Sequence, residues 1–297
     1  MKAIDMRCRP AIKGLQDQWI YDSENMVHFA KYFGGSYLAE SAKEKSIEKL
    51  LEEMESLEIE KGVFEVRRGG NPEINEEAAE LIEKYPDKFV GFVGVDVSEM
   101  EQGMADIDKY VLNGNFVGVN IEPGNPPAGK EPMFIDDERI FPLYEKCQAN
   151  NIPITITFGG PSFPDATAML PYRVETVAKN FPGLKICLCH GAWPMFTQLC
   201  TVMMSYSNIF VCVDSYLMLL PGYQDYILAA NYAFQDNIMF GTSYPLHAQE
   251  KVKDFYMKAG FREEILPKVM YDNAARFLGI AEGNPQPTMY ELLFKNV

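Results

Sequence analysis

Residues 185–213 have the sequence KICLCHGAWPMFTQLCTVMMSYSNIFVCV, in which two short apolar runs flank a longer segment. Lys185–Cys189 and Ile209–Val213 have the length and composition of buried strands. The intervening segment Met195–Ser207 has the length of a helix. Two strands joined by a helix pair in parallel within one sheet. This stretch therefore predicts one complete β–α–β unit.

The same alternation of short apolar runs and helical segments continues in both directions along the 297-residue chain. Eight such units without a change in composition favour a closed barrel over an open sheet. A doubly wound fold would place a glycine-rich phosphate loop after the first strand, where this chain has Arg7-Cys8-Arg9-Pro10. We therefore predict an α/β fold, a single (β/α)₈ TIM barrel over residues 1–297, with strands at Ala3–Met6, Gly62–Val66, Phe89–Val95, Phe116–Ile121, Ile154–Thr157, Lys185–Cys189, Ile209–Val213 and Ile238–Phe240.

Composition and charge exclude several classes of protein. Hydrophobic residues make up 47% and charged residues 23%, which fits a globular chain. The net charge of −15 argues against nucleic-acid and anionic-membrane partners, although it leaves room for a small anionic ligand held by a few arginines. The sequence has no apolar run long enough to span a membrane and begins without a signal peptide. With six scattered cysteines, this predicts a cytoplasmic protein.

An insertion at residues 9–40 separates the first predicted strand from its helix. It contains the aromatic residues Trp19, Tyr21, Phe29, Tyr32, Phe33 and Tyr37. Loops that follow barrel strands lie on the catalytic face. The insertion therefore predicts a lid, a contact between subunits of a homo-oligomer, or a buttress packed on the barrel mouth. The helix after it is predicted to begin at a capping box formed by Ser41 and Glu44.

Polar side chains follow most of the predicted strands, at the end where barrel enzymes carry their active sites. The first strand is followed by Arg7 and Arg9, and the second by Arg67 and Arg68, one of which should point inward. The later strand ends contribute Glu122, Thr157, His190, Asp214, Ser215, Ser243 and Tyr244, with His247 in the loop after the eighth strand.

Five segments in this order resemble the amidohydrolase-related family, which includes metal-dependent hydrolases and decarboxylases. The segments are Asp5-x-Arg7-x-Arg9, Ile152-Pro153-Ile154, His190-Gly191-x-x-Pro194, Phe240-Gly241-Thr242-Ser243-Tyr244-Pro245 and Asp272-Asn273-Ala274-Ala275-Arg276-Phe277. The chain departs from the family at the usual metal-binding positions. Arg7 and Arg9 stand where the resemblance implies two histidines, Thr157 where it implies a third, and Ser243 where it implies an aspartate. Only His190 is retained.

These departures change the expected chemistry. A guanidinium group has no lone pair for a metal and repels a divalent cation, whereas its planar fork binds carboxylates well. We therefore expect no metal cofactor, with zinc disfavoured, and a small anionic substrate held by Arg7, Arg9, Arg68, Thr157, Ser243, Tyr244 and His247. The alternative for Arg7 and Arg9 is a buried network of ion pairs with Asp5, Glu122 or Asp214.

The expected catalytic residues are His190, Glu122 and Asp214. His190 suits acid–base chemistry near neutral pH, and either carboxylate suits the role of the missing base. Ser215 and Ser243 lack the surroundings of a nucleophile. The first prediction is a hydrolase that cleaves an ester, lactone or amide-like bond. Its alternatives are a decarboxylase of the same family, a non-catalytic protein that binds an anion, and a metal enzyme that uses Asp5, His190 and Glu122.

Overall fold

The computed structural model describes residues 1–34, 38–68, 71, 73–160, 166–281 and 287–294. One sheet contains eight parallel strands, and each strand pairs with the next one along the chain. The strands lie close to their predicted positions: β1 (Ala3–Asp5), β2 (Ile59–Glu65), β3 (Phe89–Val95), β4 (Gly118–Ile121), β5 (Ile154–Thr157), β6 (Ile186–Cys189), β7 (Ile209–Cys212) and β8 (Ile238–Met239).

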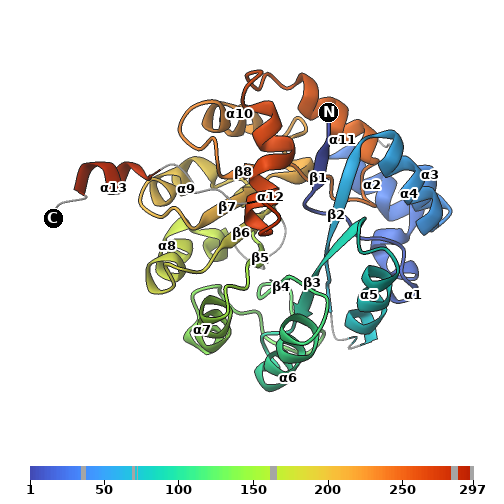
Figure 1. Ribbon diagram of the computed structural model, residues 1–297, viewed down its shortest axis with the longest axis horizontal. Coiled ribbons are helices and arrows are strands. Elements are labelled where there is room, and N and C mark those ends of the chain that lie inside the picture. Colours follow the sequence, from blue (N-terminus) through green and yellow to red (C-terminus); the bar gives the residue numbers. More distant parts are fainter. Residues whose placement is uncertain (35–37, 69–70, 72, 161–165, 282–286, 295–297) are drawn as a thin grey trace.

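The first and last strands meet through the segments that follow them. The backbone N–H of Met6 donates to the carbonyl of Phe240 over 3.1 Å, and that of Arg9 to the carbonyl of Tyr244 over 3.0 Å. Cys8 and Tyr244 also form a parallel bridge. The curled sheet is thereby joined to itself around the centre of the molecule (Figure 1). The predicted (β/α)₈ barrel is confirmed.

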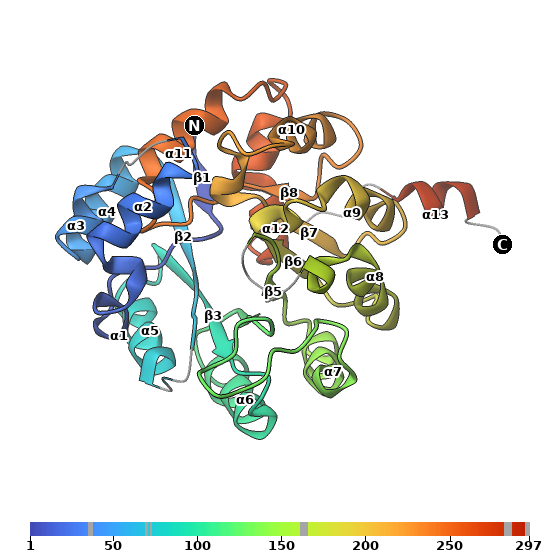
Figure 2. The same cartoon turned by 180° about the vertical axis from the view of Figure 1, so that it is seen from behind.

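Helices surround the strands in both views (Figures 1 and 2). The α-helices are α1 (Lys13–Gln16), α2 (Ser23–Lys31), α3 (Glu40–Lys43), α4 (Ile47–Ser56), α5 (Glu73–Lys84), α6 (Met100–Asp106), α7 (Phe141–Ala149), α8 (Pro171–Asn180), α9 (Phe196–Met203), α10 (Tyr223–Asn231), α11 (Gln249–Lys258), α12 (Asn273–Phe277) and α13 (Met289–Phe294). Short 3₁₀ turns are η1 (Trp19–Tyr21), η3 (Glu138–Ile140), η4 (Ala166–Met169), η5 (His190–Ala192) and η6 (Asp214–Leu217), and π-helical turns are η2 (Ile107–Leu112) and η7 (Lys268–Asp272).

The predicted capping box at Ser41 is wrong. Ser41 lies inside the short helix α3, and Lys45 then adopts a left-handed φ of 51°, which ends that helix. Helix α4 begins instead after Ser46, whose side chain accepts a hydrogen bond from the N–H of Lys49 over 3.2 Å. A serine that precedes a helical run is a plausible cap at either position, and only the left-handed residue between the helices decides which one caps.

Two apolar layers hold the barrel together. A large layer lies between the strands and the surrounding helices, and a smaller one fills the barrel itself. The short helix α12 contributes to the inner layer, where Phe277 stacks on Phe92 with the ring centres 6.1 Å apart. Asn273 holds this helix in place by donating to the carbonyl of Ile238 over 2.8 Å. Helix α12, which contains the Asn-Ala-Ala-Arg segment of the sequence, therefore packs against the inner apolar layer of the barrel.

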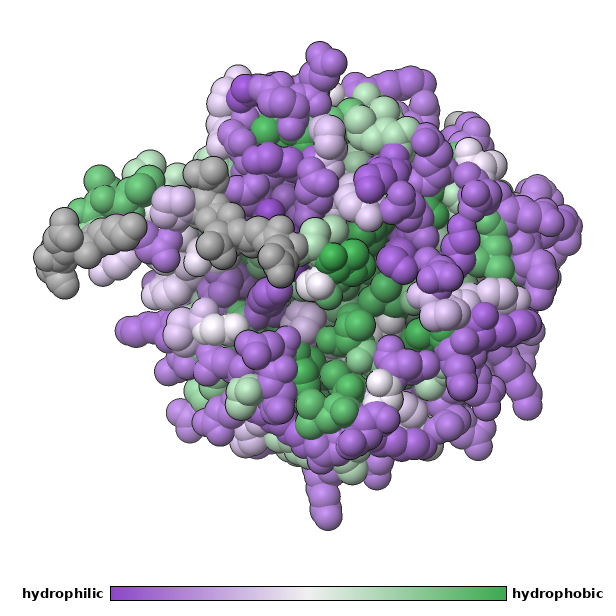
Figure 3. All heavy atoms as spheres, viewed as in Figure 1, coloured by the Kyte–Doolittle hydropathy of each residue, from purple (hydrophilic) through white to green (hydrophobic). Residues whose placement is uncertain are grey.

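The C-terminal helix α13 projects from the body of the protein (Figures 1 and 2). Its apolar side chains gather on the surface there (Figure 3), and Leu293 is 65% exposed. Among the described residues, no helix combines the length and apolar character that crossing a membrane requires.

Candidate active site

Strained backbone marks the ends of three neighbouring strands. His190 follows β6 with a φ of 65°, Asp214 follows β7 with a φ of 48°, and Ser243 follows β8 with a φ of 58°. L-residues other than glycine rarely adopt this left-handed conformation, and those that do gather at functional sites. The left-handed backbone therefore sets the direction of these three side chains at the mouth of the barrel.

Arg7 occupies the centre of that mouth, where side chains from four other strand ends meet its guanidinium group. It forms an ion pair with Glu65, and its Nη2 lies 3.3 Å from both Thr157 Oγ1 and His190 Nε2. Its Nε lies 3.8 Å from Asp214 Oδ2. Burial opposes the charge, but Glu65 and Asp214 outweigh it and raise the pKa of Arg7 well above the usual value. A fixed cation thus stands among β2, β5, β6 and β7.

His190 forms a pair with Asp214 on the other side of its ring. Its Nδ1 lies 2.9 Å from Asp214 Oδ2, and its backbone N–H donates to the same oxygen over 3.1 Å. Burial lowers the pKa of His190 and Arg7 lowers it further, against the opposing effect of Asp214. The imidazole is therefore neutral at pH 7, and the pattern of partners assigns the proton to Nδ1 and the lone pair to Nε2.

Glu122 anchors a second group of charges beside the first. Its carboxylate forms an ion pair with Arg67, lies 3.4 Å from Arg9 Nη2, and accepts a hydrogen bond from Thr157 Oγ1 over 3.0 Å. Burial raises the pKa of Glu122, but Arg67, Arg9 and Arg7 together lower it below the usual value. A carboxylate held ionised by arginines is a weak base, so this geometry favours the ion-pair alternative for Glu122. Thr157 contacts both groups.

Arg9 is the least satisfied cation of the site. Its side chain is 6% exposed, and burial, together with repulsion from Arg7, lowers its pKa to about 10. The Nε atoms of Arg9 and Arg7 are both buried without a hydrogen-bond partner among the described residues. A buried donor without an acceptor is costly, so these atoms favour a ligand that brings an anionic oxygen.

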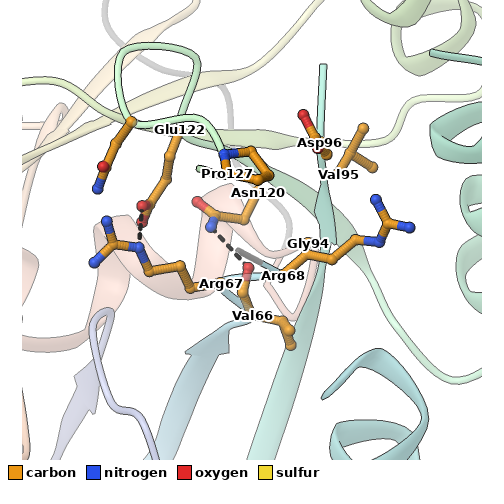
Figure 4. Close-up of a pocket in the computed structure, with 10 residues that line it drawn as sticks. Val66, Arg67, Arg68, Gly94, Val95, Asp96, Asn120, Glu122 and Pro127 are labelled. Carbon is orange, nitrogen blue, oxygen red and sulfur yellow. Dashed lines mark hydrogen bonds and ion pairs between the residues drawn. The ribbon is translucent and has the colours of Figure 1, made fainter. Parts of the chain in front are cut away.

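Three predicted substrate contacts lie away from these charges. Arg68 turns outward to Glu99 and Asp106, so Arg67, which pairs with Glu122, takes the inner position (Figure 4). The hydroxyl of Tyr244 donates to Ser41 over 2.9 Å behind the barrel mouth. His247 lies among aromatic rings.

Ser243 contacts the hydroxyl of Ser215 over 3.3 Å and none of the arginines by any interaction in the described part of the chain. Asp214 Oδ1 in turn lies 3.5 Å from the Ser215 hydroxyl. The two serines therefore belong to the support of Asp214 rather than to the group of charges around Arg7.

The insertion packs against the barrel mouth beside His190. Phe33 lies 5.0 Å from His247 and 5.2 Å from Tyr216 between ring centres, and Tyr216 lies 4.6 Å from His190. The hydroxyl of Tyr21 also donates to the carbonyl of Arg9 over 2.6 Å. The insertion thus forms a wall of the site, although Trp19 and Tyr32 remain exposed and Tyr37 lies outside the described residues.

Glu65 is a site residue that the sequence interpretation missed. It ends β2, is fully buried, and contacts both Arg7 and the thiol of Cys189, which lies 3.0 Å from Oε1. The prediction extended the second strand to Val66 and considered only the residues after it. Alternation along a strand places Glu65 on the same face as Arg67, because the two residues are two positions apart. This spacing could have identified Glu65 as a site residue.

The residues at the usual metal position do not fit a divalent ion. No group of three histidine, cysteine, aspartate or glutamate side chains is arranged to hold a metal in the part of the chain that the structure describes. Asp5, the first residue of the metal alternative, instead accepts hydrogen bonds from Thr242 over 2.8 and 2.6 Å and from Gln249 over 2.8 Å. The guanidinium of Arg7, which cannot ligate a metal, lies beside His190.

A small cavity opens at the ends of β2, β3 and β4, next to Glu122 (Figure 4). Its volume is about 30 Å³, and its polar lining includes Arg67, Asp96, Asn120 and Glu122. The cavity therefore adjoins the group of charges around Glu122.

Comparisons with known proteins agree with this fold. The model of the family described as amidohydrolase matches residues 37–280. A solved TIM-barrel protein of unknown function from Bordetella bronchiseptica is 32% identical, with a TM-score of 0.87 over 94% of this chain and 99% of that one.

Two relatives with named activities are more distant. A 2-keto-4-carboxy-3-hexenedioate hydratase from a Sphingobium species is 25% identical over 194 residues, which span 55% of this chain and 55% of the hydratase. The 2,6-dihydroxybenzoate decarboxylase from Rhizobium is 17% identical, with a TM-score of 0.66 over 79% of this chain and 88% of that one. The decarboxylase supports the likeness of fold alone.

Proposed function

The chain belongs to the amidohydrolase family, and from this premise we propose that it is a metal-independent lyase that acts on a small carboxylated molecule. The reaction is either addition of water to an activated double bond or decarboxylation. The hydratase, which is 25% identical to part of this chain, supports a lyase more than the hydrolase that the sequence first suggested.

The contact of His190 with Arg7 and Asp214 is the observation that carries this proposal. The His190 side chain is 13% exposed, whereas those of Arg7 and Asp214 are 2% and 0% exposed. His190 is therefore the member of the trio that a ligand reaches. Asp214 orients the ring, and the low pKa of His190 leaves Nε2 free of a proton at neutral pH. This is the protonation state of a general base.

Both lyase reactions develop negative charge on an oxygen of the substrate. In hydration, the single lone pair of His190 Nε2 shifts from Arg7 to a water molecule and takes a proton from it. The oxygen of that water adds to the carbon–carbon double bond, and the displaced electron pair moves onto the conjugated carbonyl or carboxylate oxygen. The proton then passes to the neighbouring carbon. In decarboxylation, the bond to the carboxylate breaks and carbon dioxide leaves its electron pair on the substrate. Water then supplies the proton that takes its place, and the remaining hydroxide combines with carbon dioxide as bicarbonate. A fixed guanidinium stabilises this charge in a buried site.

Arg9 and Thr157 are the groups that we assign to binding. Arg9 has a buried Nε without a partner among the described residues, and Thr157 lies between the two charged groups. A substrate carboxylate that accepts from Arg9 supplies the missing acceptor and lowers the repulsion between Arg9 and Arg7. The ligand that suits this site is a small anion.

Hydrolysis of an ester or lactone is the second candidate. A neutral His190 that removes a proton from water serves hydrolysis as well as hydration, so the low pKa of His190 supports both. The two reactions differ in the bond that the activated water attacks.

A parallel assay of three reactions tests the proposal. Chelator-treated protein is supplied with an unsaturated tricarboxylate such as 2-keto-4-carboxy-3-hexenedioate, with 2,6-dihydroxybenzoate, and with carboxylated lactones. We expect turnover of an unsaturated or aromatic carboxylate, with loss of the double-bond absorbance or release of carbon dioxide. Turnover of the lactones alone would replace the lyase by the hydrolase, and binding without any turnover would leave an anion-binding protein.

A further inference from the structure

The cavity at the ends of β2, β3 and β4 is lined by Asp96, a carboxylate that the proposed reaction does not use. Asp96 follows β3 directly and is 8% exposed. Its Oδ1 accepts hydrogen bonds from the N–H of Ser98 over 2.9 Å and from the Ser98 hydroxyl over 2.7 Å. Its Oδ2 is buried and has no hydrogen-bond partner among the described residues. Ser98 therefore fixes the orientation of a carboxylate that has one oxygen unsatisfied.

The space beside this oxygen is small and polar. About 30 Å³ is open to a ligand, which holds on the order of one or two water-sized groups. Asn120 lines the same cavity, but its amide is already engaged, since it donates to the carbonyl of Val66 over 2.9 Å and accepts from Thr155 over 3.0 Å. Asp96 Oδ2 is thus a buried acceptor beside the cavity without a hydrogen-bond partner in the described part of the chain. The lining also includes the exposed Asn125 and Arg68, whose buried Nε likewise has no hydrogen-bond partner there. A group that enters must bring a hydrogen-bond donor.

Glu122 places the cavity next to the proposed carboxylate site. It lines the cavity and also contacts Arg9, while Arg67 lines the cavity and pairs with Glu122 (Figure 4). The charge of Glu122 is therefore compensated by two arginines, whereas Asp96 Oδ2 is not satisfied. A ligand that spans the two regions has its anionic end near the arginines and a donor near Asp96.

We propose that the cavity is a subsite for a hydroxyl group of the substrate, which donates a hydrogen bond to Asp96 Oδ2. The substrate class is thereby a hydroxylated carboxylic acid, in which the hydroxyl and the carboxylate lie on different atoms of one small molecule. A hydroxyl matches the size of the cavity and is less costly to desolvate than an ammonium group. The inference rests on the proposed function only in assuming that the substrate also carries a carboxylate, which binds near the arginines.

Binding of paired probes tests the subsite without turnover. Calorimetry compares benzoate with its three monohydroxy isomers, and succinate with malate, on the full-length protein. We expect at least one hydroxylated member to bind roughly 10-fold tighter than its parent, as one hydrogen bond to a charged group provides. Asp96→Asn and Asp96→Ala should remove that preference and leave the affinity for benzoate and succinate within about twofold.

Asp106→Asn is the matched control. Asp106 is also a buried carboxylate, but it pairs with Arg68 on the far side of that side chain and does not line the cavity. This variant should keep the preference for the hydroxylated probe. Melting temperatures of all variants establish that they fold, and Asp96→Asn carries the test if Asp96→Ala does not fold.

Three outcomes overturn the subsite. The first is equal binding of parent and hydroxylated probes by the unaltered protein, which would leave the cavity to water. The second is a preference that survives in both Asp96 variants. The third is tighter binding of aminobenzoates than of hydroxybenzoates, which would assign the cavity to an ammonium or amine. A preserved hydroxyl preference in a protein that turns over none of the candidate substrates would remove the proposed reaction and leave the subsite standing.

Discussion

Nη2 of Arg7 lies 3.3 Å from Nε2 of His190, so a permanently charged group donates to an imidazole that must stay neutral to accept the bond. A proton on Nε2 would face a guanidinium at hydrogen-bond distance. The charge of Arg7 and the basicity of His190 are therefore coupled, and the proton transfers of the proposed mechanism depend on this coupling.

Replacing His190 should abolish most of the proposed activity. His190→Ala removes the only group of the central trio that a ligand reaches, and general acid–base groups contribute about 10²–10⁴-fold to turnover. We expect a fall in kcat of that size with a smaller change in KM. His28→Ala is the matched control, because His28 is exposed on α2. Equal activity of both variants would remove His190 from the mechanism.

The pH dependence of stability should reveal His247. Burial lowers the pKa of His247 to about 4, against an ordinary value of 6.5. The unfolded chain therefore binds the proton more readily than the folded one, so stability is present above pH 6.5 and is lost as the pH falls toward 4. Between pH 7 and pH 5 this residue alone should lower the free energy of unfolding by about 2 kcal/mol.

Urea unfolding at several pH values measures the effect of His247. His247→Leu should make the stability curve between pH 7 and pH 5 less steep, since leucine carries no titrating group. His190, whose pKa burial also lowers, supplies the slope that remains. Asp and Glu residues contribute mainly below this window. A variant whose stability falls with pH as steeply as that of the unaltered protein would show that His247 is not the titrating residue.

Arg9 should carry most of the affinity for a substrate carboxylate. Arg9→Met keeps the bulk of the side chain and removes its donors, which should cost about 1.5–3 kcal/mol for each charged hydrogen bond that is lost. Calorimetry with benzoate or sulfate measures this loss. Arg68→Met is the control, because Arg68 faces Glu99 and Asp106, and it should leave anion binding unchanged. The reverse pattern would place the anion on the outer side of β2.

Replacing only one member of the ion pair between Arg7 and Glu65 should strongly lower the free energy of unfolding. Both side chains are buried, with exposures of 2% and 0%. Glu65→Gln leaves the guanidinium with less compensation and should lower the free energy of unfolding by about 3–5 kcal/mol. The double variant Arg7→Met with Glu65→Gln should be less destabilised than the sum of the two single variants. Additive effects would indicate that the two charges do not interact.

The fold was predictable because its signals are local and repeated. Each short apolar run gave one strand, and the eight runs fall within a few residues of the eight observed strands. The error at Ser41 arose because Ser41 and Ser46 are both suitable caps. The left-handed backbone at Lys45 separates two helices that the sequence pattern merged into one.

The location of the site was predictable from the sequence, but which side chains point into it was less so. The strand-end rule located Arg7, Thr157, His190 and Asp214 in one place. It did not predict which of two adjacent residues turns inward, so Arg68 was chosen where Arg67 lies in the site. Tyr244 and His247 follow the same strand, yet the Tyr244 hydroxyl donates to Ser41 in α3 and the His247 ring packs on Phe33 of the insertion. That choice depends on packing between segments distant in the sequence.

Metal content and turnover, measured on one chelator-treated sample, test the central claim that Arg7 takes the place of a divalent ion. The sample is assayed with the substrate that the parallel screen identifies, before and after treatment and after zinc or manganese is added back. We expect no stoichiometric metal and the same kcat in all three states. One zinc or manganese ion per chain bound at His190, with turnover lost on its removal and restored on its return, would contradict it.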